Sequence, residues 1–229
     1  MKRLLLCLAL LVATACTHDT ADKTITVFGA SSLQRAFTAE GKAFEAAHPG
    51  VHVLFSFAGS QALVAQIEQG APADVLATAD LETIGKVRAK LTADPVVFAH
   101  NQLAIVTAAG NPRGLHTLQD LTTVRLVVAG PTVPLGKATA KALAAAGVKV
   151  KPLSQEDSAS GVVTKVRLGE ADAGIAYASD LGSVGGVRLA GTTTSLAIGL
   201  LNDGSEAAAF LTYVRSGAGQ RILLDAGFT

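Results

Sequence analysis

The amino-acid sequence predicts an α/β protein of two lobes, with mixed, mostly parallel sheets and a ligand cleft between the lobes. Segments of β-branched residues alternate with segments of helical periodicity along most of the chain, which is typical of sheets with helices on both faces. A long extended stretch interrupts this alternation at residues 96–106, after which the pattern starts again. Several predicted strands also end in short turns of glycine, alanine and serine, and ligands of such sheets bind at the carboxyl ends of strands.

The first half of the chain contains three units in which a strand leads toward a helix. The β-branched and aromatic residues at 24–28 favour a strand, and the apolar residues that follow recur at helical spacing. Asp80 is a residue type that often caps the start of a helix. The predicted strands are at 24–28, 51–57 and 74–78. The predicted helices are one at 33–47, a second that contains 63–67 and ends at Gly70, and a third that runs from Asp80 toward Lys90.

The second half repeats the alternation after the extended segment and a turn at Gly110-Asn111-Pro112. Two helices are expected to close the chain. The predicted elements are strands at 125–129, 174–177 and, with a weaker pattern, 196–201, and helices at about 135–146, 158–168, 206–216 and 219–226.

The first residues have the pattern of an export signal. Met1-Lys2-Arg3 is followed by an apolar run at 4–12 that is too short to span a bilayer. Small residues at 13–15 precede Cys16, which matches the site where a bacterial lipoprotein is cleaved and lipidated. Plain cleavage after Ala15 is the alternative. In either case Cys16 would be the only thiol of the mature chain, which excludes an intramolecular disulfide and a thiolate metal site.

Composition and missing motifs exclude several function classes. The chain has 19 lysines and arginines against 18 aspartates and glutamates, and no tryptophan, so neither a basic field nor an aromatic platform favours nucleic acid. No GxSxG, SxxK, HExxH or dinucleotide glycine motif is present, and the 5 histidines are scattered. We therefore expect no enzyme activity, no cofactor and no metal bound directly by side chains.

Two serine-containing turns predict an anion site. Gly29-Ala30-Ser31-Ser32 and Ala58-Gly59-Ser60 each follow a strand and open a helix. Unpaired N–H groups and partial positive charge at a helix start attract anions, and a serine hydroxyl adds a donor. Ordinary helix capping by these serines is the alternative.

Two further segments offer donors to the same kind of ligand. The segment 130–138 resembles a P-loop only superficially, because its spacing is wrong, yet the backbone N–H groups near Leu135 and Gly136 could face an anion. Lys137 is expected to be solvated. Tyr177 ends a predicted strand and carries a hydroxyl that can donate, although a half-buried aromatic residue at a sheet edge is the simpler interpretation.

These segments together resemble the molybdate-binding proteins of ABC transporters, which are periplasmic or lipid-anchored solute-binding proteins. The resemblance extends from about Thr24 to Phe228. It is carried by the segments TVFGASSL at 26–33, SFAGS at 56–60, QIEQGAPADV at 66–75, VPLG at 133–136, GEADAGIAY at 169–177 and the closing residues 219–228.

The resemblance implies a site in which two serines, two backbone N–H groups and a tyrosine hydroxyl hold an oxyanion, with no cationic side chain. These positions fall on Ser32, Ser60, Leu135, Ala159 and Tyr177. Ser158 is the alternative to Ala159, because Ser158-Ala159-Ser160 departs from the usual valine-based sequence. The segment 192–198 also lacks the usual Tyr-Pro, so ligand selectivity is left open.

The resemblance further implies a periplasmic-binding-protein-like fold whose first lobe includes the C-terminal helices. The predicted organisation is a signal peptide at 1–15, a tether at 16–23, a first lobe at 24–100 with 197–229, and a second lobe at 101–196. We expect an exported monomer, held at the outer face of the cytoplasmic membrane by lipid at Cys16, or periplasmic if it is not lipidated. Its expected partners are the permease and ATPase of an ABC importer.

The ligand expected from the resemblance is molybdate, with tungstate accepted as a near-isostere. Phosphate is disfavoured because its protonated form needs an acceptor, and no matched position is a carboxylate. Sulfate stays open as an alternative, as do iron or an organic solute. A secreted enzyme or a sensor domain on the same fold is the alternative from another class.

Overall fold

The computed structural model describes residues 22–229. The predicted signal peptide, Cys16 and most of the predicted tether lie outside the described residues. The first strand begins at Lys23, so the last residue assigned to the tether already belongs to the folded body. Within the described part of the chain, no helix is both long and apolar enough to span a membrane.

The described residues form one mixed sheet of 8 strands in the order β2-β1-β3-β8-β4-β7-β5-β6. Four of its seven strand pairings are parallel and three, all involving β4 or β8, are antiparallel, which confirms the predicted mixed, mostly parallel arrangement. The strands are β1 (Lys23–Ala30), β2 (Val51–Ala58), β3 (Val75–Thr78), β4 (Val96–Thr107), β5 (Leu126–Ala129), β6 (Ser154–Glu156), β7 (Ala173–Tyr177) and β8 (Gly185–Leu200).

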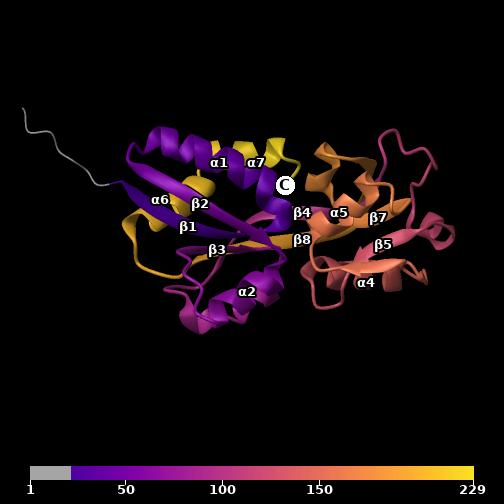
Figure 1. Ribbon diagram of the computed structural model, residues 1–229, viewed down its shortest axis with the longest axis horizontal. Coiled ribbons are helices and arrows are strands. Elements are labelled where there is room, and N and C mark those ends of the chain that lie inside the picture. Colours follow the sequence, from indigo (N-terminus) through magenta and orange to yellow (C-terminus); the bar gives the residue numbers. More distant parts are fainter. Residues whose placement is uncertain (1–21) are drawn as a thin grey trace, which may run out of the picture.

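Helices cover both faces of this sheet and divide into two groups (Figure 1). The first lobe contains β1–β3 with α1, α6 and α7 on one face and α2 on the other, and the second lobe contains β5–β7 with α4 and α5. The helices are α1 (Gln34–Ala47), α2 (Ser60–Glu68), α3 (Leu81–Gly85), α4 (Pro134–Ala145), α5 (Ala159–Arg167), α6 (Ser205–Val214) and α7 (Gly217–Asp225), with short 3-10 turns η1 (Ser31–Leu33), η2 (Arg88–Lys90), η3 (Leu118–Thr123) and η4 (Ala178–Gly182).

The long strands β4 and β8 pass through both lobes and join them into one sheet, where the sequence suggested two. Their register shifts between Val97 and Ala99 and again between Gln102 and Ala104. At the second shift, β8 has several residues opposite a single residue of β4, which bends the pair and interrupts the ladder. The transition between lobes therefore lies near Gln102, while the exact lobe boundaries at 100/101 and 196/197 stay predictions.

Most predicted elements are confirmed, and the departures have physical causes. Asp80 caps α3 by accepting a 2.7 Å hydrogen bond from the Thr83 N–H. The sequence missed the short strand β6, and it found only the last part of β8. The first part of β8 contains Gly185, Gly186 and Gly191, a residue type that weakens strand patterns, and its pairing depends on a partner strand distant in sequence.

Candidate ligand-binding site

The structure brings all five residues singled out in the sequence to one small cavity between the two lobes. They arrive from different elements: Ser32 from η1 after β1, Ser60 from the start of α2, Leu135 and Ala159 from the starts of α4 and α5, and Tyr177 from the end of β7. The lining residues are Ala30, Ser31, Ser32, Gly59, Ser60, Ala79, Val133, Pro134, Leu135, Ala159 and Tyr177.

The size of the cavity restricts what it could hold in this closed arrangement. It measures about 10 Å³, close to the minimum of ~10–15 Å³ that admits one water molecule. Pockets for organic ligands are usually about 300–1,000 Å³. In this arrangement of the lobes, the space is therefore far too small for a sugar, a peptide or another organic solute.

Two hydroxyl groups of the lining are buried without a partner in the described structure. The Oγ of Ser32 and the OH of Tyr177 make no hydrogen bond, although Ser32 is only 6% exposed and Tyr177 only 2%. Buried polar groups are nearly always satisfied, because leaving one unpaired costs free energy. Both hydroxyls are therefore free to donate to whatever occupies the cavity.

The third hydroxyl is oriented by the protein itself. Ser60 Oγ accepts a hydrogen bond of 3.1 Å from the Ala79 N–H. Since this bond uses an oxygen lone pair, the hydroxyl hydrogen of Ser60 stays free to donate. Ser60 is the first residue of α2, and its N-cap is Gly59, without a side-chain cap bond; η1 likewise begins after Ala30 without one. Ordinary capping therefore does not account for Ser32 or Ser60.

Backbone donors reach the cavity from two helix starts. Val133 precedes α4, and this helix has no side-chain cap, so the Leu135 N–H stays unpaired among the described residues. Gly136 lets this turn pack closely, because a Cβ there would lie 1.9 Å from the Gly130 carbonyl oxygen. An uncapped helix start of this kind is a favourable place for an anion.

At the start of α5 the hydrogen bonds favour Ala159 over its two serine neighbours. Ser158 is the N-cap, and its Oγ accepts from the Gly161 N–H at 3.2 Å. The Ser160 N–H donates to Ser31 Oγ at 3.4 Å. The Ala159 N–H has no such partner in the described chain, and of Ser158, Ala159 and Ser160 only Ala159 lines the cavity.

The described lining of the cavity is electrically neutral. It contains no lysine, arginine, histidine or carboxylate. Burial, with smaller contributions from Asp80 and Asp180, raises the pKa of Tyr177 far above its ordinary value, so its hydroxyl keeps its proton. Every polar side chain of the lining can thus donate to an anion without carrying charge.

Lys137 forms an ion pair at the surface and takes no part in the cavity lining. Its ammonium group lies 2.5 Å from Glu82 Oε1 of α3, and it is absent from the cavity lining. Glu82 has a lowered pKa because of its hydrogen bond and charge interaction with Lys137. The residue is paired at the surface, so the expectation of a solvated lysine holds only in part.

Ala79 was missed as a contributor to the site, and Ser31 was named only as part of a predicted anion-binding turn. Ala79 orients Ser60, and Ser31 both lines the cavity and contacts the second lobe. Ala79 directly follows the strand β3, so the rule that ligands lie at strand ends could have found it. Its role is exerted through the backbone N–H, which residue type does not reveal.

A larger cavity in the second lobe lacks the features of a specific site. It measures about 480 Å³ and lies between α4 and β8. Leucine and alanine side chains dominate its lining, with threonines and Lys141 at the side. The Thr192 hydroxyl there is already used, since it donates to the Leu189 carbonyl and accepts from the Leu103 N–H. In the described residues, no group of three or more histidine, cysteine or acidic side chains could hold a metal ion.

Comparison with known structures identifies the fold. A periplasmic molybdate-binding protein from Azotobacter vinelandii superposes with a TM-score of 0.74 at 17% identity, covering 90% of this chain and 98% of the other. The sulfate-binding protein SubI from Mycobacterium tuberculosis superposes with a TM-score of 0.69 at 18% identity, covering 90% and 86%. At these identities the likeness concerns the fold, which is the two-lobe fold of solute-binding proteins.

Sequence comparison identifies the family. Residues 25–229 match the model of a family described as bacterial extracellular solute-binding protein. The chain is also 43% identical over 220 residues to the molybdate-binding protein ModA of Mycobacterium tuberculosis, covering 90% of this chain and 84% of the relative. The chain belongs to this family of bacterial extracellular solute-binding proteins.

Proposed function

We propose that this protein captures molybdate outside the cytoplasm and delivers it to an ABC importer. The observation that carries the proposal is the set of neutral donors at one small cavity: the hydroxyls of Ser32, Ser60 and Tyr177 and the N–H groups of Leu135 and Ala159. A relative 43% identical is named as molybdate-binding, which supports this choice among oxyanions.

Neutral donors suffice for a doubly charged anion. A hydrogen bond to an ionised group is roughly twice as strong as one between neutral groups, and five donors converge here. A fully ionised tetrahedral anion requires only donors, which this lining supplies. Monohydrogen phosphate would also place a proton against the lining, which contains no carboxylate to accept it.

The neutral lining also favours release. A buried lysine or arginine would hold a dianion by direct charge pairing, and its own desolvation would complicate both binding and dissociation. With hydrogen bonds alone, separating the lobes removes the donors of one lobe and exposes the anion to water. The proposed transport cycle therefore needs no proton transfer and no cofactor.

Calorimetric titration of the mature protein with molybdate, tungstate, sulfate and phosphate tests the proposal. We expect saturable one-to-one binding of molybdate and tungstate, weaker binding of sulfate, and no binding of phosphate at the same concentrations. If sulfate bound most tightly of the four, the protein would be assigned to sulfate and not to molybdate. Absence of binding by all four anions would refute an oxyanion function.

We further propose that the protein acts as a monomer attached to the outer face of the membrane through lipid on Cys16. The family is extracellular, and the sequence before Cys16 supports export and lipidation. We also propose lobe boundaries at 100/101 and 196/197. With these boundaries, the chain passes from one lobe to the other once within β4 and once within β8.

A further inference from the structure

The two lobes come into close contact beside the cavity, at Gly59 and Asp157. A Cβ atom on Gly59 would lie 2.2 Å from the carbonyl oxygen of Asp157, a distance that no pair of such atoms tolerates. Gly59 has φ −60° and ψ 136°, a conformation open to any L-amino acid. The glycine is therefore required by the approach of the second lobe and not by its own backbone conformation.

A hydrogen bond joins the lobes at the same place. Gln61 Nε2 donates to the Asp157 carbonyl oxygen at 2.7 Å. Gln61 is not a lining residue of the cavity, so this bond belongs to the contact between lobes. The contact flanks the proposed site on both sides: Gly59 and Gln61 enclose Ser60, and Asp157 lies two residues before Ala159.

Other contacts also join the lobes. The guanidinium of Arg35 donates to the Ser179 carbonyl oxygen at 3.3 Å, and that of Arg188 donates to the Gly227 carbonyl oxygen at 3.3 Å. Ser160 N–H reaches Ser31 Oγ only at 3.4 Å. The pair of Lys137 and Glu82 has side chains 31% and 65% exposed, and exposed ion pairs contribute little and are screened by salt. The contact of Gly59 and Gln61 with Asp157 combines a 2.7 Å hydrogen bond with close backbone packing directly beside Ser60.

We propose that Gly59 and Gln61 form a closing latch, which stabilises the contact between the lobes and so determines how slowly the ligand leaves; Gly59 also borders the cavity, whereas Gln61 does not. Gly59 supplies the space for the Asp157 carbonyl, and Gln61 supplies the hydrogen bond. A ligand held only by the closed state gains or loses affinity with the stability of that state. This latch rests on the proposed oxyanion-binding function and names residues that control it.

The substitution Gly59→Ala should impair closure of the lobes without disturbing the fold of the first lobe. Its backbone conformation suits alanine, so the ligand-free protein should keep its unfolding temperature, whereas the methyl group should prevent full closure. We expect molybdate affinity to fall by at least tenfold, mostly through faster dissociation. Gly85→Ala is the matched control, because a Cβ there meets nothing within 4 Å, and it should bind like the wild type.

A second variant tests the hydrogen bond alone. Gln61→Ala deletes one bond between neutral groups, which corresponds to roughly a two- to twelvefold faster dissociation. The association rate should change little, because the open protein has not yet made this bond. The exposed Gln66→Ala of the same helix serves as its control.

Small-angle scattering distinguishes a latch from damage to the neighbouring Ser60. With saturating molybdate, the Ser60→Ala protein should still become as compact as the wild type, whereas Gly59→Ala should stay expanded. If Gly59→Ala bound and compacted like the wild type, the latch would be wrong while the oxyanion function stood. If the wild-type protein bound none of the four anions, the proposed oxyanion function would be refuted, and the latch, which rests on it, would be refuted too.

Discussion

The Ala79 N–H donates to Ser60 Oγ over 3.1 Å, and this bond leaves the Ser60 hydroxyl hydrogen free at the cavity. The backbone of one strand end thus sets the direction of a side-chain donor on the neighbouring helix. The orientation exists before any ligand arrives, so the entropy of ordering this hydroxyl is not lost on binding.

Removing a serine hydroxyl should weaken binding without unfolding the protein. Ser32→Ala or Ser60→Ala deletes a hydrogen bond to a charged ligand, worth about 1.5–3 kcal/mol, or roughly tenfold to over a hundredfold in affinity. Titration calorimetry measures the loss, and the exposed Ser205→Ala is the control. Unchanged affinity in both cavity variants would remove the serines from the site.

A negative charge in the same place should abolish binding. Ser60→Asp puts a carboxylate against the dianion, while a carboxylate oxygen can still accept from the Ala79 N–H. Because Ser60 is only 2% exposed, the variant should also lose some stability, which thermal unfolding of the ligand-free protein measures. Binding within about twofold of the wild type would exclude Ser60 from the site.

Tyr177→Phe should have opposite effects on binding and on stability. The ring stays in place, but the donor to the ligand is lost, so affinity should fall by roughly tenfold or more. The ligand-free variant should be at least as stable as the wild type, because the buried hydroxyl that it removes has no partner. A variant that was much less stable without ligand would show that the hydroxyl has a structural partner instead.

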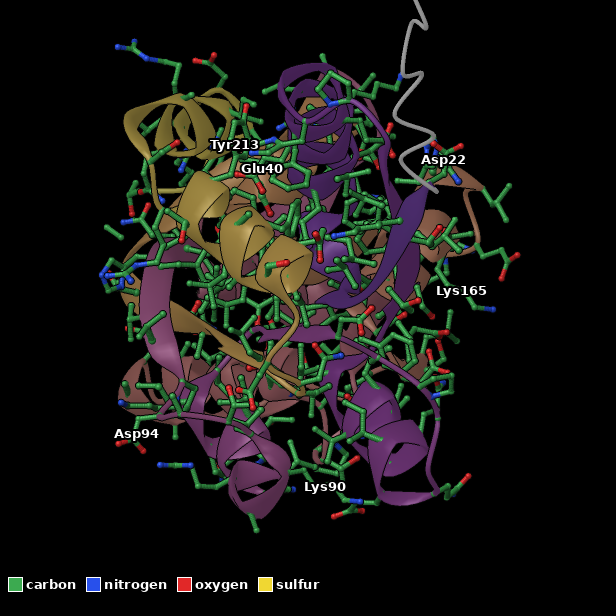
Figure 2. The ribbon with its side chains drawn as sticks, turned by 90° about the vertical axis from the view of Figure 1, so that its left-hand side faces the viewer. Asp22, Glu40, Lys90, Asp94, Lys165 and Tyr213 are labelled. Atoms are coloured by element: carbon green, nitrogen blue, oxygen red, sulfur yellow. The ribbon has the colours of Figure 1, made fainter. Side chains whose placement is uncertain are left out.

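Glu40 should make the protein less stable as the pH rises. This residue of α1 is fully buried, without a hydrogen-bond partner in the described structure, and it lies close to Tyr213 of α6 (Figure 2). Burial raises its pKa from 4.5 to about 8. Between these values the folded state holds a proton that the unfolded state releases, so the free energy of unfolding falls as pH increases.

Glu40→Gln should remove much of this dependence. The free energy of unfolding of the wild type should drop by on the order of 3 kcal/mol from pH 5 to pH 8 through this group. The variant should keep a smaller slope, to which Asp180 contributes around pH 6 because burial raises its pKa to about 6, and it should be more stable at pH 8. Denaturant unfolding at several pH values provides the measurement. The exposed Glu68→Gln is the control, and an identical slope in all three proteins would contradict the assignment.

Lipid attachment at Cys16 has a direct test. The mature protein should partition with membranes and carry a modified N-terminal cysteine, which detergent fractionation and mass spectrometry detect. Cys16→Ser should release it in soluble form. A wild-type protein that was already soluble and began at an unmodified residue would favour plain cleavage.

The sequence was sufficient for most of the strand and helix order, β6 excepted, and for all five residues that meet at the cavity. Strand ends and helix starts are local features, so their small residues could be recognised one segment at a time. The roles of Ala79 and Gly59 could not, because one acts through a backbone N–H and the other through space left for Asp157. Both depend on a partner far away in the chain, as does the first half of β8.

The passage of β4 and β8 through both lobes restricts how the molecule can open. Two strands that are hydrogen-bonded to each other cannot slide lengthwise without breaking their ladder, but they can bend where the ladder is interrupted, near Gln102. Relative motion is thereby reduced to rotation about nearly a single axis. Ser32 and Ser60 then part from Leu135, Ala159 and Tyr177 together, so the anion is either fully enclosed or held by one side alone.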